Sequence, residues 1–470
     1  TRMAIFTKEG RPLYGPVPTN NVFRGFGGAC EAMNNGDAVV RYDQLADRWL
    51  LVMPTFTRAP ARDDQPAVWT ARAEAYISPI GRPNQPGPAA PLFIPPRPAV
   101  PSASPTPVVS GPAASPTPPP TGPYSMCYAV SATSDPLGPW YRYEFLRPLF
   151  PDYPRPAVWP DGYYVPTSTG DEVIQKHACV ADRSRMLRGE PASEQCVIID
   201  GVNFLNNADL DGTRLPPKGA PNVMLAAGGT QLRNELSSDA LFAWSFHVDW
   251  NDPAKTRVDG PTRLAVAPYH YLCGGQLTHC VPQPGSERRI DAQGDKLMAR
   301  VVYRNLGDRE ALVAAHSVNT SAGAGGVRFY EFDVRRDRSL HLRQQGTYAP
   351  DASFRWMPSP VLDRDGNLGI GYSFGSASAF PGQRFAGRRA SDPPGQLTLR
   401  EAVLVDGEAA QSPMRWEDYT QTAVDPVDDC TLWYVGDYVK KDAASYSTRI
   451  GAFRFPSCVR RASGSGTTAR

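Results

Sequence analysis

The sequence lacks long apolar runs, an excess of either charge, and the residue patterns of common metal and nucleotide sites. No stretch of about 18 apolar residues is present, so we expect no membrane-spanning helix. Lys and Arg number 49 against 47 Asp and Glu, giving a net charge of +2. This balance argues against a nucleic-acid-binding protein, which needs a basic surface, and against a polybasic membrane anchor.

Catalytic signatures are also missing. The six histidines are scattered, and the sequence contains no HExxH or CxxC motif, no GxSxG elbow, no P-loop and no Rossmann glycine pattern. No signal peptide stands at Thr1, which is compatible with a mature secreted form. The common metalloprotease, serine hydrolase and nucleotide-binding classes are therefore not indicated.

Proline and glycine, in contrast, are abundant, with 49 and 41 of the 470 residues. Chains interrupted this often cannot be mainly helical. Sixteen prolines fall between Pro83 and Pro123, where Arg97 is the only charged residue. Such a segment cannot form the interior of a helix or sheet. We predict a Pro-rich insertion at 83–123 rather than a linker between domains, because strand-like sequence resumes at Tyr124.

The eight cysteines can be grouped into four pairs of neighbours in the sequence, and these pairs suit disulfide bonds. Three pairs have short separations, and the remaining two cysteines form a fourth pair across the insertion. An even count with close spacing favours an oxidising compartment and an extracellular location; eight unrelated buried thiols are the alternative. The predicted pairs are Cys30–Cys127, Cys179–Cys196, Cys273–Cys280 and Cys430–Cys458.

Short strands separated by turns recur along the chain. The segment 361–370 places Asp365-Gly366 between two apolar runs, which is typical of a β-hairpin. An inner strand, a turn and a second apolar strand recur in units that begin near residues 36, 152, 205, 294, 354 and 414. A second hairpin follows the first in each unit. Two hairpins per unit make a four-stranded blade, and blades arranged radially form a β-propeller.

The stretch AIFTKEGRPLYG, which begins at Ala4, has the pattern of half a further blade. We therefore predict an all-β, disulfide-stapled, seven-bladed β-propeller whose first blade is incomplete, with six blades as the alternative. An incomplete blade exposes strand edges, which suggests that upstream sequence or another segment completes it. One propeller domain is expected over 1–458, followed by a flexible tail at 459–470.

Several motifs resemble a family of secreted bacterial proteins that are predicted β-propellers of mostly unassigned function. The resemblance runs through most of the chain, as in YGPVPTNNVFRGFGGAC, FPDYPRPAVWPDGYY, GDKLMARVVYRNLGDRE and VDPVDDCTLWY. It implies a propeller fold but supplies no catalytic residues. The Pro-rich insertion departs from the family, as does Glu417, which stands where the resemblance leads us to expect Gly.

Polar and aromatic residues recur where the units begin, close to the expected mouth of a central channel. Carboxylates, arginines and aromatic rings would together suit a sugar or an anionic glycan. The main alternative is that these residues make structural contacts that hold neighbouring blades together. A catalytic role is a further alternative. The candidates are Asp152, Tyr153, Asp161, Asp295, Arg300, Arg304, His316, Arg355, Trp356, Arg415, Trp416 and Asp418, with Asp37 at the same position in the first unit.

Calcium is the one metal that the sequence suggests, because Asp209 and Asp211 offer oxygen ligands in a loop. No cofactor is required by any motif. We expect a non-enzymatic extracellular module that binds a glycan or protein partner, or assembles through the half blade or the Pro-rich arm. The alternative is a glycan-active hydrolase, either a glycosidase or a sialidase-like enzyme, which needs two carboxylates beside the scissile bond.

Overall fold

Short β-strands joined by tight turns make up most of the described chain, as the proline and glycine content predicts. The structure is a computed structural model, and it describes residues 1–57, 71–79, 123–169, 175–199, 204–228, 239–275, 279–443 and 445–458. The predicted tail at 459–470, and the Pro-rich insertion except for Pro123, lie outside these residues. The domain boundary predicted at 458 therefore stays a prediction.

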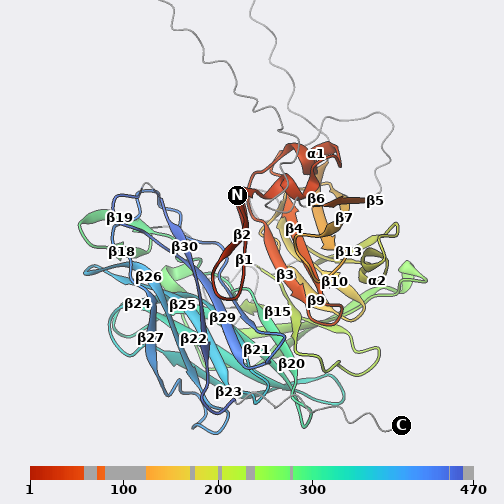
Figure 1. Cartoon of the computed structure of the whole chain (residues 1–470). Helices are drawn as coiled ribbons and strands as arrows, with labels where there is room; N and C mark the ends of the chain where they lie inside the picture. The colour runs from red at the N-terminus through yellow and green to blue at the C-terminus, as the bar shows by residue number, and fades with distance from the viewer. Residues whose placement is uncertain are drawn as a thin grey trace, which may run out of the picture.

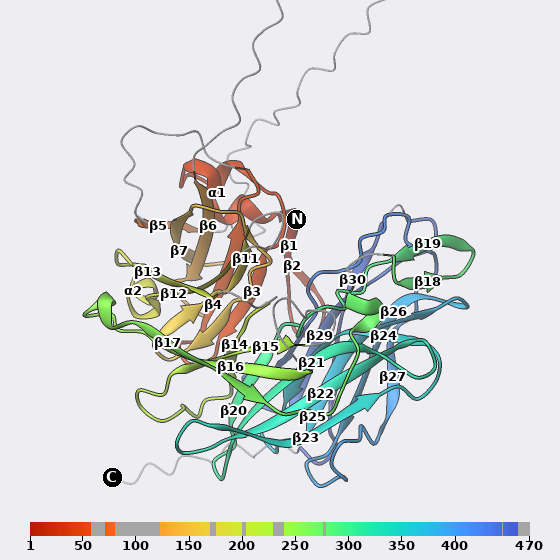
Figure 2. The same cartoon turned by 180° about the vertical axis from the view of Figure 1, so that it is seen from behind.

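Most strands belong to six successive antiparallel units, which we number in chain order (Figures 1 and 2). Unit 1 contains β3 (Val39–Asp43), β4 (Arg48–Pro54), β6 (Tyr124–Ser131) and β7 (Pro139–Arg147), with β5 (Ala71–Pro79) beside β7. Unit 2 contains β9 (Ala157–Trp159), β10 (Gly162–Tyr164), β12 (Gln175–Ala181) and β13 (Glu194–Ile199), joined by β8 (Pro151–Asp152) and β11 (Thr167–Thr169).

The remaining units follow the same order. Unit 3 contains β14 (Asn206–Asp211), β15 (Asn222–Gly228), β16 (Ala240–His247) and β17 (Arg257–Leu264). Unit 4 contains β20 (Val301–Asn305), β21 (Glu310–Asn319), β22 (Gly325–Val334) and β23 (Leu340–Tyr348). Unit 5 contains β24 (Phe354–Leu362), β25 (Leu368–Ser376), β26 (Ala379–Arg388) and β27 (Leu399–Val405). Unit 6 contains β28 (Gln421–Val424), β29 (Thr431–Tyr438) and β30 (Ser447–Arg454).

Two hairpins and a few short helices lie outside these units. The hairpin β1 (Arg2–Phe6)–β2 (Pro12–Pro18) forms its own sheet between units 1 and 6 (Figure 1), and Lys8 at its tip contacts Asp425 of unit 6 at 2.7 Å. The other hairpin is β18 (Val281–Gln283)–β19 (Ser286–Ile290). The helices are α1 (Gly28–Ala32), α2 (Arg183–Leu187) and the 3-10 turns η1 (Thr19–Phe23), η3 (Pro253–Lys255) and η4 (Leu272–Gly275).

The first strands of the six units follow one another in a closed circuit. In unit 3, β14 pairs in parallel with β20 of unit 4, and side-chain hydrogen bonds make the other links. Thr422 N–H of β28, for example, donates to Ser359 Oγ of β24 at 2.9 Å. Arg41 of β3 donates to Gln421 of β28, which joins the last unit to the first. The strands therefore begin at one end of the ring and finish at the other.

The core lies between the faces of neighbouring sheets, because each sheet presents apolar residues on both sides. One large group of buried residues joins units 2, 3 and 4, and further groups join units 1 and 2 and units 4 and 5. Close approach needs small residues at some positions. A Cβ atom on Gly371 of β25 would lie 2.2 Å from Tyr434 of β29, so only glycine fits there.

These observations confirm the all-β fold and all four predicted disulfides. The hairpin predicted at 361–370 is also confirmed, since β24 ends at Leu362 and β25 begins at Leu368. Seven blades are not confirmed. Among the described residues, β1 and β2 pair only with each other, and six units close the circuit.

Candidate functional site

Residues from four units meet where the first strands begin, and we call this group the rim cluster. Asp37 precedes β3 of unit 1, and Asp152 and Tyr153 precede β9 of unit 2. Residues 291–296 precede β20 of unit 4, and 415–419 precede β28 of unit 6. The rim cluster consists of Asp37, Asp152, Tyr153, Arg155, Asp291, Gln293, Asp295, Lys296, Arg415, Asp418 and Tyr419.

Two tyrosines form the centre of the rim cluster. The rings of Tyr153 and Tyr419 stack with centroids 4.7 Å apart, although the residues are 266 positions apart in the sequence. Tyr153 donates its hydroxyl hydrogen to the carbonyl of Asp418 at 2.5 Å, and Tyr419 donates to Asp37 Oδ2 at 3.2 Å. Tyr153 is buried, whereas Tyr419 is partly exposed. The tyrosines thus connect units 1, 2 and 6.

Asp418 is the most connected carboxylate in the cluster. It accepts hydrogen bonds from Arg415 at 2.7 and 2.8 Å and from Gln293 Nε2 at 2.7 Å. Arg415 reaches in the other direction to Asp291 Oδ2 at 3.0 Å. Asp418 remains partly exposed, and so do Asp37 and Asp152. Three carboxylates and one tyrosine therefore reach the surface together.

Four carboxylates of the cluster, those of Asp37, Asp152, Asp291 and Asp418, hold protons more tightly than free aspartate does. Burial, followed by the neighbouring charges of Asp418 and Asp152, raises the pKa of Asp37 to about 7. Burial also raises the pKa of Asp291 to about 6, and it raises the pKa of both Asp152 and Asp418. The site can therefore hold proton donors and ionised acceptors side by side near neutral pH.

Two buried cations also belong to the cluster. Lys296 pairs with Asp295 at 2.6 Å, and its ammonium lies 4.2 Å from the ring centroid of Phe204. Arg155 is 2% exposed, and none of its three guanidinium nitrogens makes a hydrogen bond to a described residue. Its guanidinium lies 4.9 Å from the Tyr153 ring and 5.0 Å from the Phe204 ring. Burial lowers the pKa of Arg155 to about 10. A buried cation with unused donors is costly, so this one marks a position where a ligand or water can bind.

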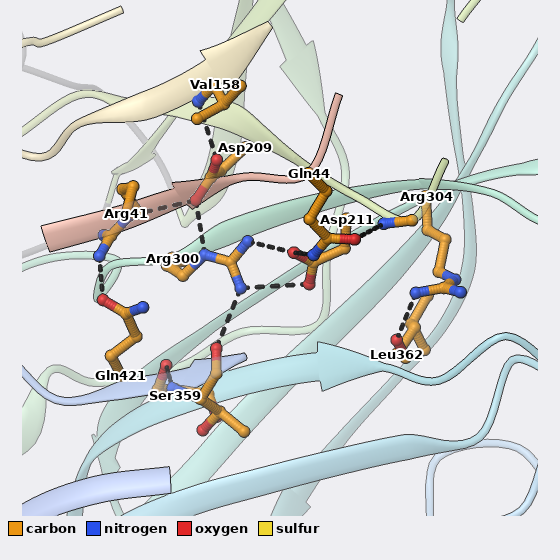
Figure 3. Close-up of polar contacts among 12 residues, drawn as sticks. Arg41, Gln44, Val158, Asp209, Asp211, Arg300, Arg304, Ser359, Leu362 and Gln421 are labelled. Carbon is orange, nitrogen blue, oxygen red and sulfur yellow. Dashed lines mark hydrogen bonds and ion pairs between the residues drawn. The ribbon is translucent and has the colours of Figure 1, made fainter. Parts of the chain in front are cut away.

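A second polar network crosses the ring along the first strands (Figure 3). Arg300 donates from Nε to Asp209 Oδ2 and from Nη2 to Asp211 Oδ1, both at 2.6 Å. Arg41 also contacts Asp209 Oδ2, at 3.2 Å. The second oxygen of Asp209 accepts from the backbone N–H of Val158 at 2.8 Å. All of these side chains are buried, so the network joins units 1, 2, 3 and 4 rather than facing solvent.

This network determines what several predicted site residues do. Arg304 donates to the carbonyl of Leu362 at 3.2 Å and pairs with Asp429, joining units 4, 5 and 6. Arg300 and Arg304 therefore link different units and have a structural role. Asp209 and Asp211 were the candidates for calcium, and both carboxylates instead engage guanidinium groups. The calcium prediction is untested, and the geometry does not favour it.

Other candidates from the sequence have structural partners and do not belong to the rim cluster. His316 hydrogen-bonds through Nε2 to Tyr330 at 2.9 Å, and burial lowers its pKa to about 3. Arg355 makes two contacts each with Asp351 and Glu401. Three more candidates also make structural contacts. Trp356 and Trp416 are 0% and 1% exposed and belong to one group of buried apolar residues. Asp161 accepts a hydrogen bond from the Tyr164 hydroxyl at 3.1 Å.

Five of the predicted candidates, together with Asp37, do meet in the rim cluster. These are Asp152, Tyr153, Asp295, Arg415 and Asp418. Sequence reasoning missed Arg155, Asp291, Gln293, Lys296 and Tyr419, although each lies within four positions of a candidate. Glu417 was noted where Gly was expected. It has a φ of 30°, in the region that favours glycine, and its buried carboxylate accepts from Ser373 at 2.6 Å.

Metal and membrane signals are few in the described chain. Cys179, Glu194 and Cys196 lie close enough to hold an ion, but the two cysteines form a disulfide and offer no thiolate. No helix among the described residues is both long and apolar enough to cross a membrane.

Comparisons with known proteins give little further information. No family model matches the chain, and no curated protein matches it. Among solved structures, a mutant of the NanB sialidase from Streptococcus pneumoniae is similar at a TM-score of 0.31 and 10% identity, over 54% of this chain and 33% of that one. Likeness at this level carries no argument about fold or activity. The resemblance to a family of secreted bacterial propellers therefore stays a prediction.

Proposed function

We propose that this chain is a secreted, six-bladed β-propeller whose rim cluster binds a glycan. The closed circuit of six antiparallel units supports the propeller, and four disulfides support an extracellular location. The rim cluster lies mostly in loops at one end of the circuit, and binding residues are found disproportionately in loops that a rigid scaffold positions. The role is one of binding, without catalysis.

One observation carries the proposal for a glycan. Asp37, Asp152, Asp418 and Tyr419 come from three units and are all partly exposed. Tyr419 hydrogen-bonds to Asp37 and stacks on Tyr153, which follows Asp152 and hydrogen-bonds to the carbonyl of Asp418. Carboxylates accept hydrogen bonds from sugar hydroxyls, and such charge-assisted bonds are stronger than neutral ones. The Tyr419 ring offers an apolar face to the carbon side of a sugar.

The buried cations add a preference within this class of ligand. Arg155 and Lys296 add two buried positive charges to the cluster, and Arg155 has donors that no described residue uses. A sugar that carries a carboxylate could therefore engage Arg155 once it displaces water.

The experiment is a screen of the purified protein on a glycan array, followed by calorimetry with the best ligand. We expect saturable binding that weakens by about tenfold in Asp418→Asn, because one charge-assisted hydrogen bond is worth about that much affinity. Asp442→Asn, an exposed aspartate outside the cluster, is the matched control. No binding on the array, or equal affinity in Asp418→Asn, would contradict the proposal.

A glycan hydrolase is the second candidate, and the raised pKa of Asp37 is the observation that favours it. An acid with a pKa of about 7 beside ionised carboxylates has the character of a general acid. Incubating the array ligand with the protein and measuring released reducing ends separates the two functions. Release that disappears in Asp37→Asn supports the hydrolase, and an intact ligand supports simple binding.

A further inference from the structure

At the opposite end of the ring, units 4 and 5 enclose a polar cavity of about 460 Å³. Its walls come from the turn between β20 and β21, the turn between β24 and β25, the end of β26, and strands β22 and β23. These turns follow the first strands of their units, whereas the rim cluster precedes them. The cavity is therefore separate from the rim cluster.

Four arginines and four acidic residues line this cavity. Arg309, Arg343, Arg364 and Arg388 all line it. Arg388 is 3% exposed, and its Nε makes no hydrogen bond within the described chain. Its Nη2 donates to a backbone carbonyl, that of Asp392, at 2.5 Å. A buried guanidinium normally has a carboxylate or another full set of acceptors, so Arg388 is left with capacity for a ligand.

Glu331 and Asp392, two of the four acidic residues of the cavity, do not fill that role. Glu331 accepts from Arg309 and from Gln344, and so its two oxygens are already engaged. The carboxylate of Asp392 accepts from the backbone N–H of Arg389 at 2.7 Å and from the Thr398 hydroxyl. Arg343, which is 47% exposed, makes only long contacts of 3.4 Å and 3.9 Å with acidic groups of the described residues. Within the part of the chain that the structure describes, two arginines of the cavity thus lack a close carboxylate partner.

We propose that this cavity binds a tetrahedral oxyanion, a sulfate or phosphate group carried on a small polar molecule, with Arg388 and Arg343 as its ligands. Arginine presents a planar set of donors that matches such oxyanions. The volume is within the range of small-molecule pockets, roughly 300–1,000 Å³, and exceeds what a bare ion needs. The exposed Asp308 and Asp365 at its wall suit hydroxyl groups on the rest of the molecule. A sulfated or phosphorylated monosaccharide combines these features.

The test is calorimetric titration with N-acetylglucosamine 6-sulfate, N-acetylglucosamine 6-phosphate and unmodified N-acetylglucosamine at constant ionic strength, with sodium chloride as the salt. We expect one or both of the charged sugars to bind saturably and the uncharged sugar not to bind. Arg388→Gln should weaken binding by about tenfold or more. Arg389→Gln removes the same charge one residue away on an exposed side chain, so it should leave the affinity unchanged.

The two charged sugars distinguish a sulfate ligand from a phosphate ligand. If Arg388→Gln does not fold, Arg343→Gln replaces it, because Arg343 is exposed and tolerates change. Absence of binding by both charged sugars, or an affinity that neither variant weakens, overturns the proposal. The proposal does not depend on the rim cluster, since Asp418→Asn should leave this binding intact.

Discussion

Replacing Asp37 with Asn should stabilise the protein at alkaline pH, although it removes a charged group from the rim cluster. Burial and two neighbouring carboxylates raise the pKa of Asp37 from 3.8 to about 7. Between about pH 4 and pH 7 the folded protein therefore holds a proton that the unfolded chain has released. Folding stability must fall as the pH rises through this range, and the loss is complete above pH 7.

The expected gain in stability follows from the two pKa values of Asp37, 3.8 in the unfolded chain and about 7 in the folded protein. Each pKa unit corresponds to about 1.4 kcal/mol, so the full difference sets a ceiling of about 4 kcal/mol. Asp152 and Asp418 interact with Asp37, so part of this energy is shared with them, and we expect a gain of about 2 kcal/mol. Asparagine keeps an oxygen that can accept from Tyr419, and it tolerates the φ of 55° at this position.

Urea unfolding followed by tryptophan fluorescence at pH 4.5 and pH 8 measures the effect. Asp37→Asn should be more stable than wild type at pH 8, with a smaller difference at pH 4.5. The control is Asp442→Asn, because Asp442 is exposed and has a similar φ of 61°. A variant that is less stable than wild type at pH 8, or equally shifted at both pH values, would refute the reasoning.

Two further predictions concern the framework that holds the units together. Arg300→Gln should lower the free energy of unfolding by about 3–5 kcal/mol, because it removes the buried cation that pairs with Asp211 and leaves only Arg41 beside Asp209; the urea midpoint measures this, and an unchanged midpoint would contradict it. Replacing Cys30 and Cys127 together with Ala should cost about 2–5 kcal/mol, since their disulfide links positions 97 residues apart. Thermal unfolding with and without reductant checks this second prediction, and wild type should lose its advantage when reduced.

The repeated hairpins could be predicted from the sequence because their signals are local. Turn residues such as Asp365-Gly366 act on their immediate neighbours, and alternating apolar residues identify strands without any knowledge of distant contacts. The six predicted unit beginnings fall at or shortly before the first strands of the six units. The disulfide pairing could also be predicted from the sequence, because the close spacing of the cysteines leaves few alternative pairs.

The sequence could not show which polar residues link neighbouring units and which belong to the rim cluster. Arg300 and Arg155 look alike in the sequence, yet one contacts two carboxylates and the other hydrogen-bonds to none of the described residues. The difference depends on which units become neighbours, and Asp209 lies 91 residues from Arg300. Tyr419 was not predicted for the same reason. Its place in the cluster depends on stacking on Tyr153, which belongs to another unit.

The most direct test of the account is a crystal structure of the protein with the strongest ligand from the glycan array. We expect a sugar in contact with Asp37, Asp152, Asp418 and Tyr419, at the end of the ring where the first strands begin. A ligand bound only elsewhere, for example in the arginine-lined cavity between units 4 and 5, would contradict the rim cluster as the glycan site.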